Sequence, residues 1–168
     1  MPLREARSNL SCANLVRVMI TIGIRAEPSA VTFVVYNSDT REIVNIEEIK
    51  IPAAFEVPDG LKYIRSNLLD VLREYRVERA GVRITEPNAD ANKQRVQLEG
   101  VIQEAFASSE LSGYYVGQIS SISARIGIQR TAFKPLVDGH QQYPVDNWRT
   151  MKKPAREALL CAVGATDA

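Results

Sequence analysis

The sequence is short of several features that mark common classes of protein. It has two cysteines, Cys12 and Cys161, and a single histidine, so it holds no Cys/His spacing typical of a structural zinc site. No run of about 18 apolar residues occurs, and residues 1–14 lack the apolar segment of a secretory signal. These absences predict a cytoplasmic protein with reduced thiols and no membrane partner.

A strong charge of either sign is also absent. The 21 basic and 20 acidic residues leave a net charge of +1, so any surface for nucleic acid must be a local patch. Apolar residues make up 45% of the 168 residues, which is typical of a globular protein and sufficient for the core of one domain. We expect a flexible tail over residues 1–14 and a single domain over residues 15–168.

Three apolar segments rich in β-branched residues predict consecutive strands at the start of the domain. They cover residues 17–25, 30–36 and 42–51, and short polar turns separate them. Strands joined in this way form an antiparallel meander.

The hydrophobic pattern then takes on the period of a helix. Apolar residues recur at helical spacing over residues 61–75, and Asp59 is expected to cap this helix. A short strand and a second helix follow over residues 80–85 and 89–107. Val96, Ile102, Ala105 and Phe106 of this helix are expected to face the sheet, and Gly100 is expected to permit close packing. The rest of the chain predicts a strand, a short helix, a polar loop and a last helix, over residues 113–120, 121–128, 129–147 and from 148 or 154 to 163.

This order predicts an α/β fold with a mixed five-stranded sheet, in which an antiparallel meander leads into a parallel βαβ region flanked by helices. Few folds use that order, and the ribonuclease-H-like fold is one of them. Actin-like ATPases share the same core, but they need glycine-rich phosphate loops. The comparable segment here, residues 23–29, contains one glycine.

Three local matches resemble RuvC, the Holliday-junction resolvase family of the ribonuclease-H-like superfamily. Residues 23–25 (Gly-Ile-Arg) are similar to the end of its first strand, but Arg25 stands where the family has a metal-binding aspartate. Glu86 and residues 88–90 (Asn-Ala-Asp) resemble its glutamate strand and the helix that follows. The last helix is also similar, with Glu157 at the position of the family's aspartate.

The resemblance implies a nuclease site in which carboxylates hold two Mg²⁺ or Mn²⁺ ions. Arg25 cannot serve there, because a guanidinium stays protonated and offers only donors. A substitute catalytic set would be Glu27, Glu86 and Glu157, with Glu86 and Glu157 as metal ligands if the protein is active. The alternative is that Arg25 pairs with Glu86 and closes the former metal pocket. In either case Arg25→Asp is expected to restore metal binding.

A basic cluster near the last helix is the candidate surface for a nucleic-acid backbone, and it consists of Arg149, Lys152, Lys153 and Arg156, beside Trp148. The alternative is a solvated helix start with Trp148 packed in the core. A second, weaker patch comprises Arg125, Arg130 and Lys134, and the lone His140 is expected to be exposed.

Together these features predict a catalytically inactive RuvC-like domain that binds DNA or RNA or serves in a nucleic-acid-processing assembly, with no cofactor. The alternatives are a divergent Mg- or Mn-dependent endonuclease and a protein-interaction scaffold without a nucleic-acid role. RuvC works as a dimer, so the resemblance also implies a homodimer or other protein subunits as partners.

Overall fold

The structure is a computed structural model that describes residues 18–168, so the predicted tail over residues 1–14 lies outside the described part. Its elements are, in chain order, β1 (Ile20–Glu27), β2 (Ala30–Asn37), β3 (Glu42–Lys50), α1 (Val57–Glu74), β4 (Arg79–Arg83), α2 (Lys93–Ala107), β5 (Gly113–Gly117), α3 (Ile119–Ile126), α4 (Arg130–Val137), the 3₁₀ turn η1 (Trp148–Thr150), α5 (Lys153–Gly164) and the 3₁₀ turn η2 (Ala165–Asp167).

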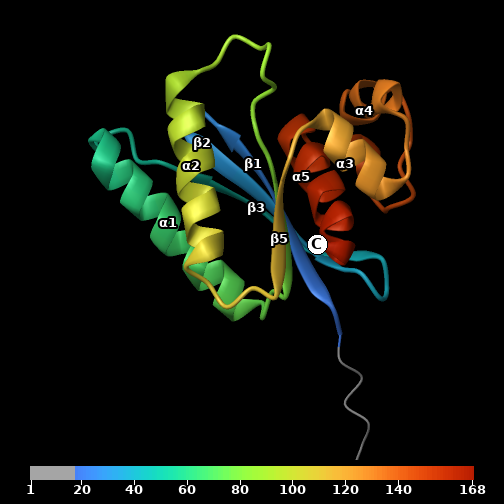
Figure 1. Cartoon of the computed structure of the whole chain (residues 1–168), viewed down its shortest axis with the longest axis horizontal. Coiled ribbons are helices and arrows are strands. Elements are labelled where there is room, and N and C mark those ends of the chain that lie inside the picture. Colours follow the sequence, from blue (N-terminus) through green and yellow to red (C-terminus); the bar gives the residue numbers. More distant parts are fainter. Residues whose placement is uncertain (1–17) are drawn as a thin grey trace, which may run out of the picture.

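The five strands form one mixed sheet in the order β3-β2-β1-β4-β5. β1, β2 and β3 pair antiparallel, whereas β4 pairs parallel with both β1 and β5. Helices α1 and α2 cover one face of this sheet, and α3, α4 and α5 lie on the other (Figure 1). The predicted fold class is therefore confirmed. No helix within residues 18–168 is long and apolar enough to cross a membrane.

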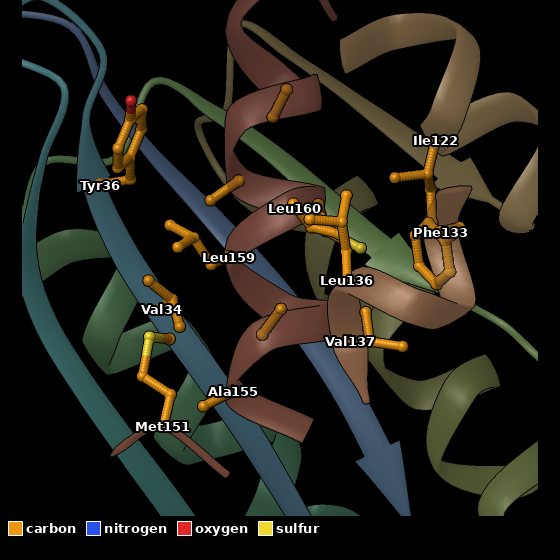
Figure 2. Close-up of a cluster of buried hydrophobic side chains, with 14 of the residues drawn as sticks. Val34, Tyr36, Ile122, Phe133, Leu136, Val137, Met151, Ala155, Leu159 and Leu160 are labelled. Atoms are coloured by element: carbon orange, nitrogen blue, oxygen red, sulfur yellow. The ribbon is translucent and has the colours of Figure 1, made fainter. Parts of the chain in front are cut away.

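Each face of the sheet has its own hydrophobic core. The core under α1 and α2 includes Ile24, Phe33 and Leu68. The core under α5 gathers side chains from β2, α3, α4 and α5 (Figure 2). Trp148 belongs to this second core, is fully buried, and donates from Nε1 to the carbonyl of Gln141 at 2.9 Å. Its core position is therefore confirmed, and it offers no face on which a base could stack.

Helix α5 lies unusually close to the sheet because glycine lines its path. Gly23 of β1 pairs in register with Gly81 of β4. A Cβ atom on Gly23 would lie 1.8 Å from the carbonyl oxygen of Ala158, and one on Gly81 would lie 2.8 Å from that of Cys161. Only glycine permits this approach of helix backbone to strand backbone. The approach places the start of α5 directly over the next residues of β1 and β4.

Cys161 lies on this buried side of α5 as a free cysteine. Burial raises the pKa of its thiol to about 12. The thiol therefore stays protonated at neutral pH, and it is a packing group rather than a nucleophile.

Two helix starts differ from the predicted ones. Helix α1 begins at Val57, so Asp59 lies in its first turn and the N-cap residue Glu56 makes no side-chain cap bond. Pro58 fits this first turn because proline has no N–H to satisfy there. Helix α2 begins at Lys93, and Asn92 caps it by accepting from the backbone N–H of Arg95 at 3.0 Å.

The buried face of α2 also differs in part from the prediction. Ile102, Ala105 and Phe106 are buried as expected, and Leu98 joins them. Val96 and Gly100 are exposed instead, because they lie on the opposite side of the helix from that apolar stripe.

The predicted polar loop over residues 129–147 is wrong in its first half, which forms α4. Phe133, Leu136 and Val137 repeat at helical spacing and are buried in the core under α5. Pro135 lies inside the helix and conceals this pattern, because proline usually breaks helices. The short helix tolerates it, since the tertiary packing of its apolar side stabilises the turn.

Candidate functional site

Two arginines lie side by side where the neighbouring parallel strands end. Arg25 of β1 pairs in register with Arg83 of β4, one alternate position beyond the pair Gly23 and Gly81. Side chains at alternate positions share one face of a sheet, so both arginines face α5. Because α5 approaches the glycines so closely, Glu157 lies within reach of both guanidinium groups.

One carboxylate oxygen binds both arginines. Oε2 of Glu157 lies 2.7 Å from Nε of Arg25 and 3.0 Å from Nη1 of Arg83. Arg25 also donates from Nη1 to the carbonyl of Arg83 at 3.2 Å. The exposed fractions are 8% for each arginine and 5% for Glu157, so the cluster is almost fully withdrawn from water.

Glu99 of α2 adds a second negative charge to the cluster. Its Oε1 lies 3.8 Å from Nη1 of Arg25 and accepts from both the backbone N–H and the hydroxyl of Thr85, each at 2.9 Å. Neither Glu99 nor Arg83 was predicted from the sequence as part of the site. The available signal was a charged residue at a buried position: Glu99 falls within the apolar stripe of α2, and Arg83 within an apolar strand.

The predicted pairing of Arg25 with Glu86 is wrong. Glu86 lies three residues beyond the end of β4, where its Oε1 accepts from the backbone N–H of Ile119 at 2.7 Å and lies 3.9 Å from Nη2 of Arg83. The position opposite Arg25 on β4 belongs to Arg83, and the neutralising carboxylate comes from α5. Arg25 does have a nearby carboxylate, as expected of a buried cation, but Glu157 supplies it instead of Glu86.

The electrostatics of the cluster follow from burial and from the short distances. Burial lowers the pKa of the Arg25 guanidinium, Glu157 raises it, and the neighbouring Arg83 lowers it again. Arginine stays protonated even so. Two buried cations therefore share Glu157, and Glu99 and Glu86 complete the compensation of charge.

The carboxylates proposed for catalysis do not come together as a metal centre. Within residues 18–168 no group of three or more His, Cys, Asp or Glu side chains could hold a metal ion. Glu157 is bound to two guanidinium groups, Glu86 caps the start of α3, and Glu27 borders a separate cavity with Thr32 and Lys152. Hard divalent cations need free oxygen ligands, so these residues do not fit a pair of Mg²⁺ or Mn²⁺ ions.

Arg156 is not available to contact a phosphate backbone, which corrects the prediction for this residue. It is buried on α5 and donates from Nε to the carbonyl of Trp148 at 3.0 Å, from Nη1 to that of Val137 at 3.0 Å, and from Nη2 to that of Arg149 at 2.9 Å. Its guanidinium thus joins the end of α4 to the start of α5.

Replacing Arg156 by methionine is expected to lower the free energy of unfolding by about 3 kcal/mol. The change removes three hydrogen bonds from the guanidinium to backbone carbonyls, and one hydrogen bond to a charged group contributes about 1.5–3 kcal/mol. Urea unfolding followed by circular dichroism measures the loss. Arg149→Met is the control, because the Arg149 side chain is exposed, and a similar loss in both variants would contradict the role of Arg156.

The other residues of the predicted basic cluster are exposed. Lys153 Nζ lies 2.6 Å from Oδ1 of Asp138, and Lys152 Nζ lies 4.0 Å from Oε2 of Glu48, so each lysine has a carboxylate nearby. Arg149 forms no ion pair with any residue from 18 to 168. His140 is exposed just after α4, as expected of a lone loop histidine.

The antiparallel meander and the parallel βαβ region give this chain a ribonuclease-H-like fold. Solved structures similar to this chain include RuvC of Thermus thermophilus, with a TM-score of 0.65, 14% identity, and coverage of 87% of this chain and 92% of that one. RuvC of the same organism in complex with a Holliday junction substrate gives a TM-score of 0.61 and 14% identity, over 87% of this chain and 91% of that one.

The chain therefore has a RuvC-like fold, and at this level of identity the likeness concerns the fold alone. No protein-family model matches the sequence. No curated protein matches it either.

Proposed function

We propose that this chain is a catalytically inactive RuvC-like domain that binds nucleic acid or acts as a subunit of a nucleic-acid-processing assembly. The observation that carries the proposal is the bond of Glu157 to both Arg25 and Arg83 within this fold. Phosphodiester cleavage by two metal ions needs carboxylates at that place, and a guanidinium there repels a cation instead.

The absence of catalysis has a direct test. The protein is incubated with Mn²⁺ and with branched DNA, linear DNA or RNA, and no cleavage above the buffer control is expected. The alternative, a divergent endonuclease using Glu27, Glu86 and Glu157, requires Glu157 to leave both guanidinium groups. Cleavage by the native protein that disappears in a Glu27→Gln variant, which leaves the buried ion pairs intact, would establish this alternative and overturn the proposal.

Support for a nucleic-acid partner comes from basic side chains that lack carboxylate partners. Arg130 and Lys134 of α4 border a cavity of about 210 Å³ together with Ile119 and Thr131, and no acidic side chain borders it. Neither cation forms an ion pair with any residue in the described range 18–168. Ile119 donates its N–H to Glu86, so this basic surface adjoins the arginine cluster.

Charge reversal of Arg130 and Lys134 to glutamate is expected to weaken binding to labelled DNA or RNA by about 10–100-fold. It should also reduce the magnitude of the slope of log K against log salt concentration by about 2. Each phosphate contact that is lost means that about one counterion fewer is released from the nucleic acid on binding. Binding by fluorescence anisotropy at several salt concentrations measures both quantities.

The matched control reverses Lys62 and Arg76, which are exposed near the two ends of α1 on the other face of the sheet. Equal losses in the two double variants would contradict a surface centred on α4. No binding of any nucleic acid by the native protein would overturn the nucleic-acid proposal altogether.

A protein-interaction role is the second candidate, and an apolar groove favours it. Phe55 and Val57 are 43% and 52% exposed beside a cavity that Ile51 and Leu61 also border. Exposed apolar side chains that cluster in this way mark contact surfaces more often than isolated ones do. The proposal extends to a cytoplasmic homodimer or a complex with other subunits, and sedimentation at several concentrations tests for the dimer.

A further inference from the structure

A second cavity, of about 450 Å³, lies between the β2–β3 side of the sheet and the start of α5. Its apolar border includes Ile46, Met151 and Ala155. Figure 2 shows Met151 and Ala155 beside β2 at this end of the molecule. Five polar residues border the same cavity: Glu27, Thr32, Glu47, Glu48 and Lys152.

Three of these residues, Glu27, Thr32 and Glu48, lie on one face of the sheet. Thr32 of β2 pairs in register with Glu48 of β3 on one side and with Arg25 of β1 on the other. Glu27 follows Arg25 by two positions along β1, so it points to the same side. The register thus brings two carboxylates and one hydroxyl together beneath the start of α5.

The acceptor groups of this cavity are largely unused. Thr32 is only 6% exposed, yet its hydroxyl forms no hydrogen bond with any residue in the described range. Glu27 forms no ion pair within that same range. Glu48 has one cation nearby, Lys152 Nζ at 4.0 Å, and the side chain of Lys152 is 84% exposed, so this contact is long and weak.

We infer that this cavity binds an alkylammonium group. An ammonium has three N–H donors, and the carboxylates of Glu27 and Glu48 and the hydroxyl of Thr32 offer three acceptors. The apolar border by Ile46, Met151 and Ala155 suits the methylene stem that carries such a group. The Thr32 hydroxyl has no hydrogen-bond partner among residues 18–168, so its oxygen is free to accept from a bound ammonium.

Two kinds of ligand present an alkylammonium group: a free polyamine and the lysine side chain of a protein partner. The inference does not depend on nucleic-acid binding. A divalent metal is the poorer fit, because the residues from 18 to 168 bring no three acidic, Cys or His side chains together here.

The test is a titration of the ¹⁵N-labelled full chain with n-butylammonium, followed by NMR. Saturable shifts are expected at Glu27, Thr32 and Glu48, and none with the neutral n-butanol. Glu27→Gln and Glu48→Gln should each weaken binding about 10-fold, as expected when a charge-assisted hydrogen bond becomes a neutral one. Glu74→Gln, an exposed acid at the end of α1, is the control and should bind as the native protein does.

Parallel titrations with spermidine and with an acetylated, amidated lysine peptide distinguish the two sources. Tighter binding of spermidine indicates a polyamine site, and tighter binding of the peptide indicates a docking site for lysine. The inference is overturned if n-butanol gives the same shifts, if butylammonium leaves the three residues unshifted, or if Mg²⁺ displaces it from them.

Discussion

Replacing Glu157 by glutamine is expected to lower the free energy of unfolding by about 3–5 kcal/mol, the cost of removing one partner from a buried ion pair. In this protein the carboxylate serves two cations, since Arg25 and Arg83 both bind its Oε2. Glutamine has nearly the same shape, so the loss reports on charge rather than on packing. Urea unfolding of the native and variant proteins measures it.

Two controls separate burial from charge. Glu104→Gln removes an exposed carboxylate that binds Arg65, and it should change stability little because water screens such pairs. Replacing the whole buried cluster with Arg25→Met, Arg83→Met, Glu157→Leu and Glu99→Gln should recover most of the lost stability, since uncharged groups of similar volume can replace a buried ion cluster. A Glu157→Gln variant as stable as the native protein would show that the cluster does not hold α5 on the sheet.

Joint replacement of Arg25 by aspartate and Arg83 by glutamate is expected to create a Mn²⁺ site at this cluster. The double change puts two carboxylates beside Glu157 and removes both guanidinium groups from its Oε2. Oxygen ligands of this kind hold divalent cations. Saturation with Mn²⁺ at about 100 times Kd should then stabilise the variant by about 2.7 kcal/mol, which a thermal shift and calorimetry can measure.

Arg25→Asp alone is the informative control. The sequence suggested that this single change would restore metal binding, but Arg83 would remain 3.0 Å from Glu157 and would pair with both carboxylates. The single variant should therefore take up no Mn²⁺. Uptake by the single variant equal to that of the double variant would contradict the role assigned to Arg83.

Local pattern was sufficient to predict most of the fold. The β-branched segments, the change to helical period and the short turns led to the observed sheet and helices. The exceptions are α4 and the starts of α1 and α2. Local rules predict that Pro135 ends a helix, because proline breaks an isolated helix. In the folded protein the helix tolerates Pro135, because the burial of Phe133 and Val137 stabilises it.

The candidate site was predicted only in part, and the missing part depends on register. Arg25 and Glu157 were singled out from the sequence, and they meet at 2.7 Å. Arg83 and Glu99 were not, since nothing in the sequence states which residue of β4 lies opposite Arg25. Arg156 was assigned to the surface because it follows two exposed lysines, yet the turn of α5 carries it into the core.

The amino-acid order alone therefore determines that an arginine lies near the end of the first strand and that an acidic residue lies in the last helix. Whether these charges neutralise each other or face solvent is a matter of three-dimensional placement, which the glycines under α5 and the strand register decide. The reason is physical: propensity and hydrophobic period act over neighbouring residues, whereas the energy of a buried charge depends on partners far away along the chain, such as Glu157 for Arg83, 74 residues apart.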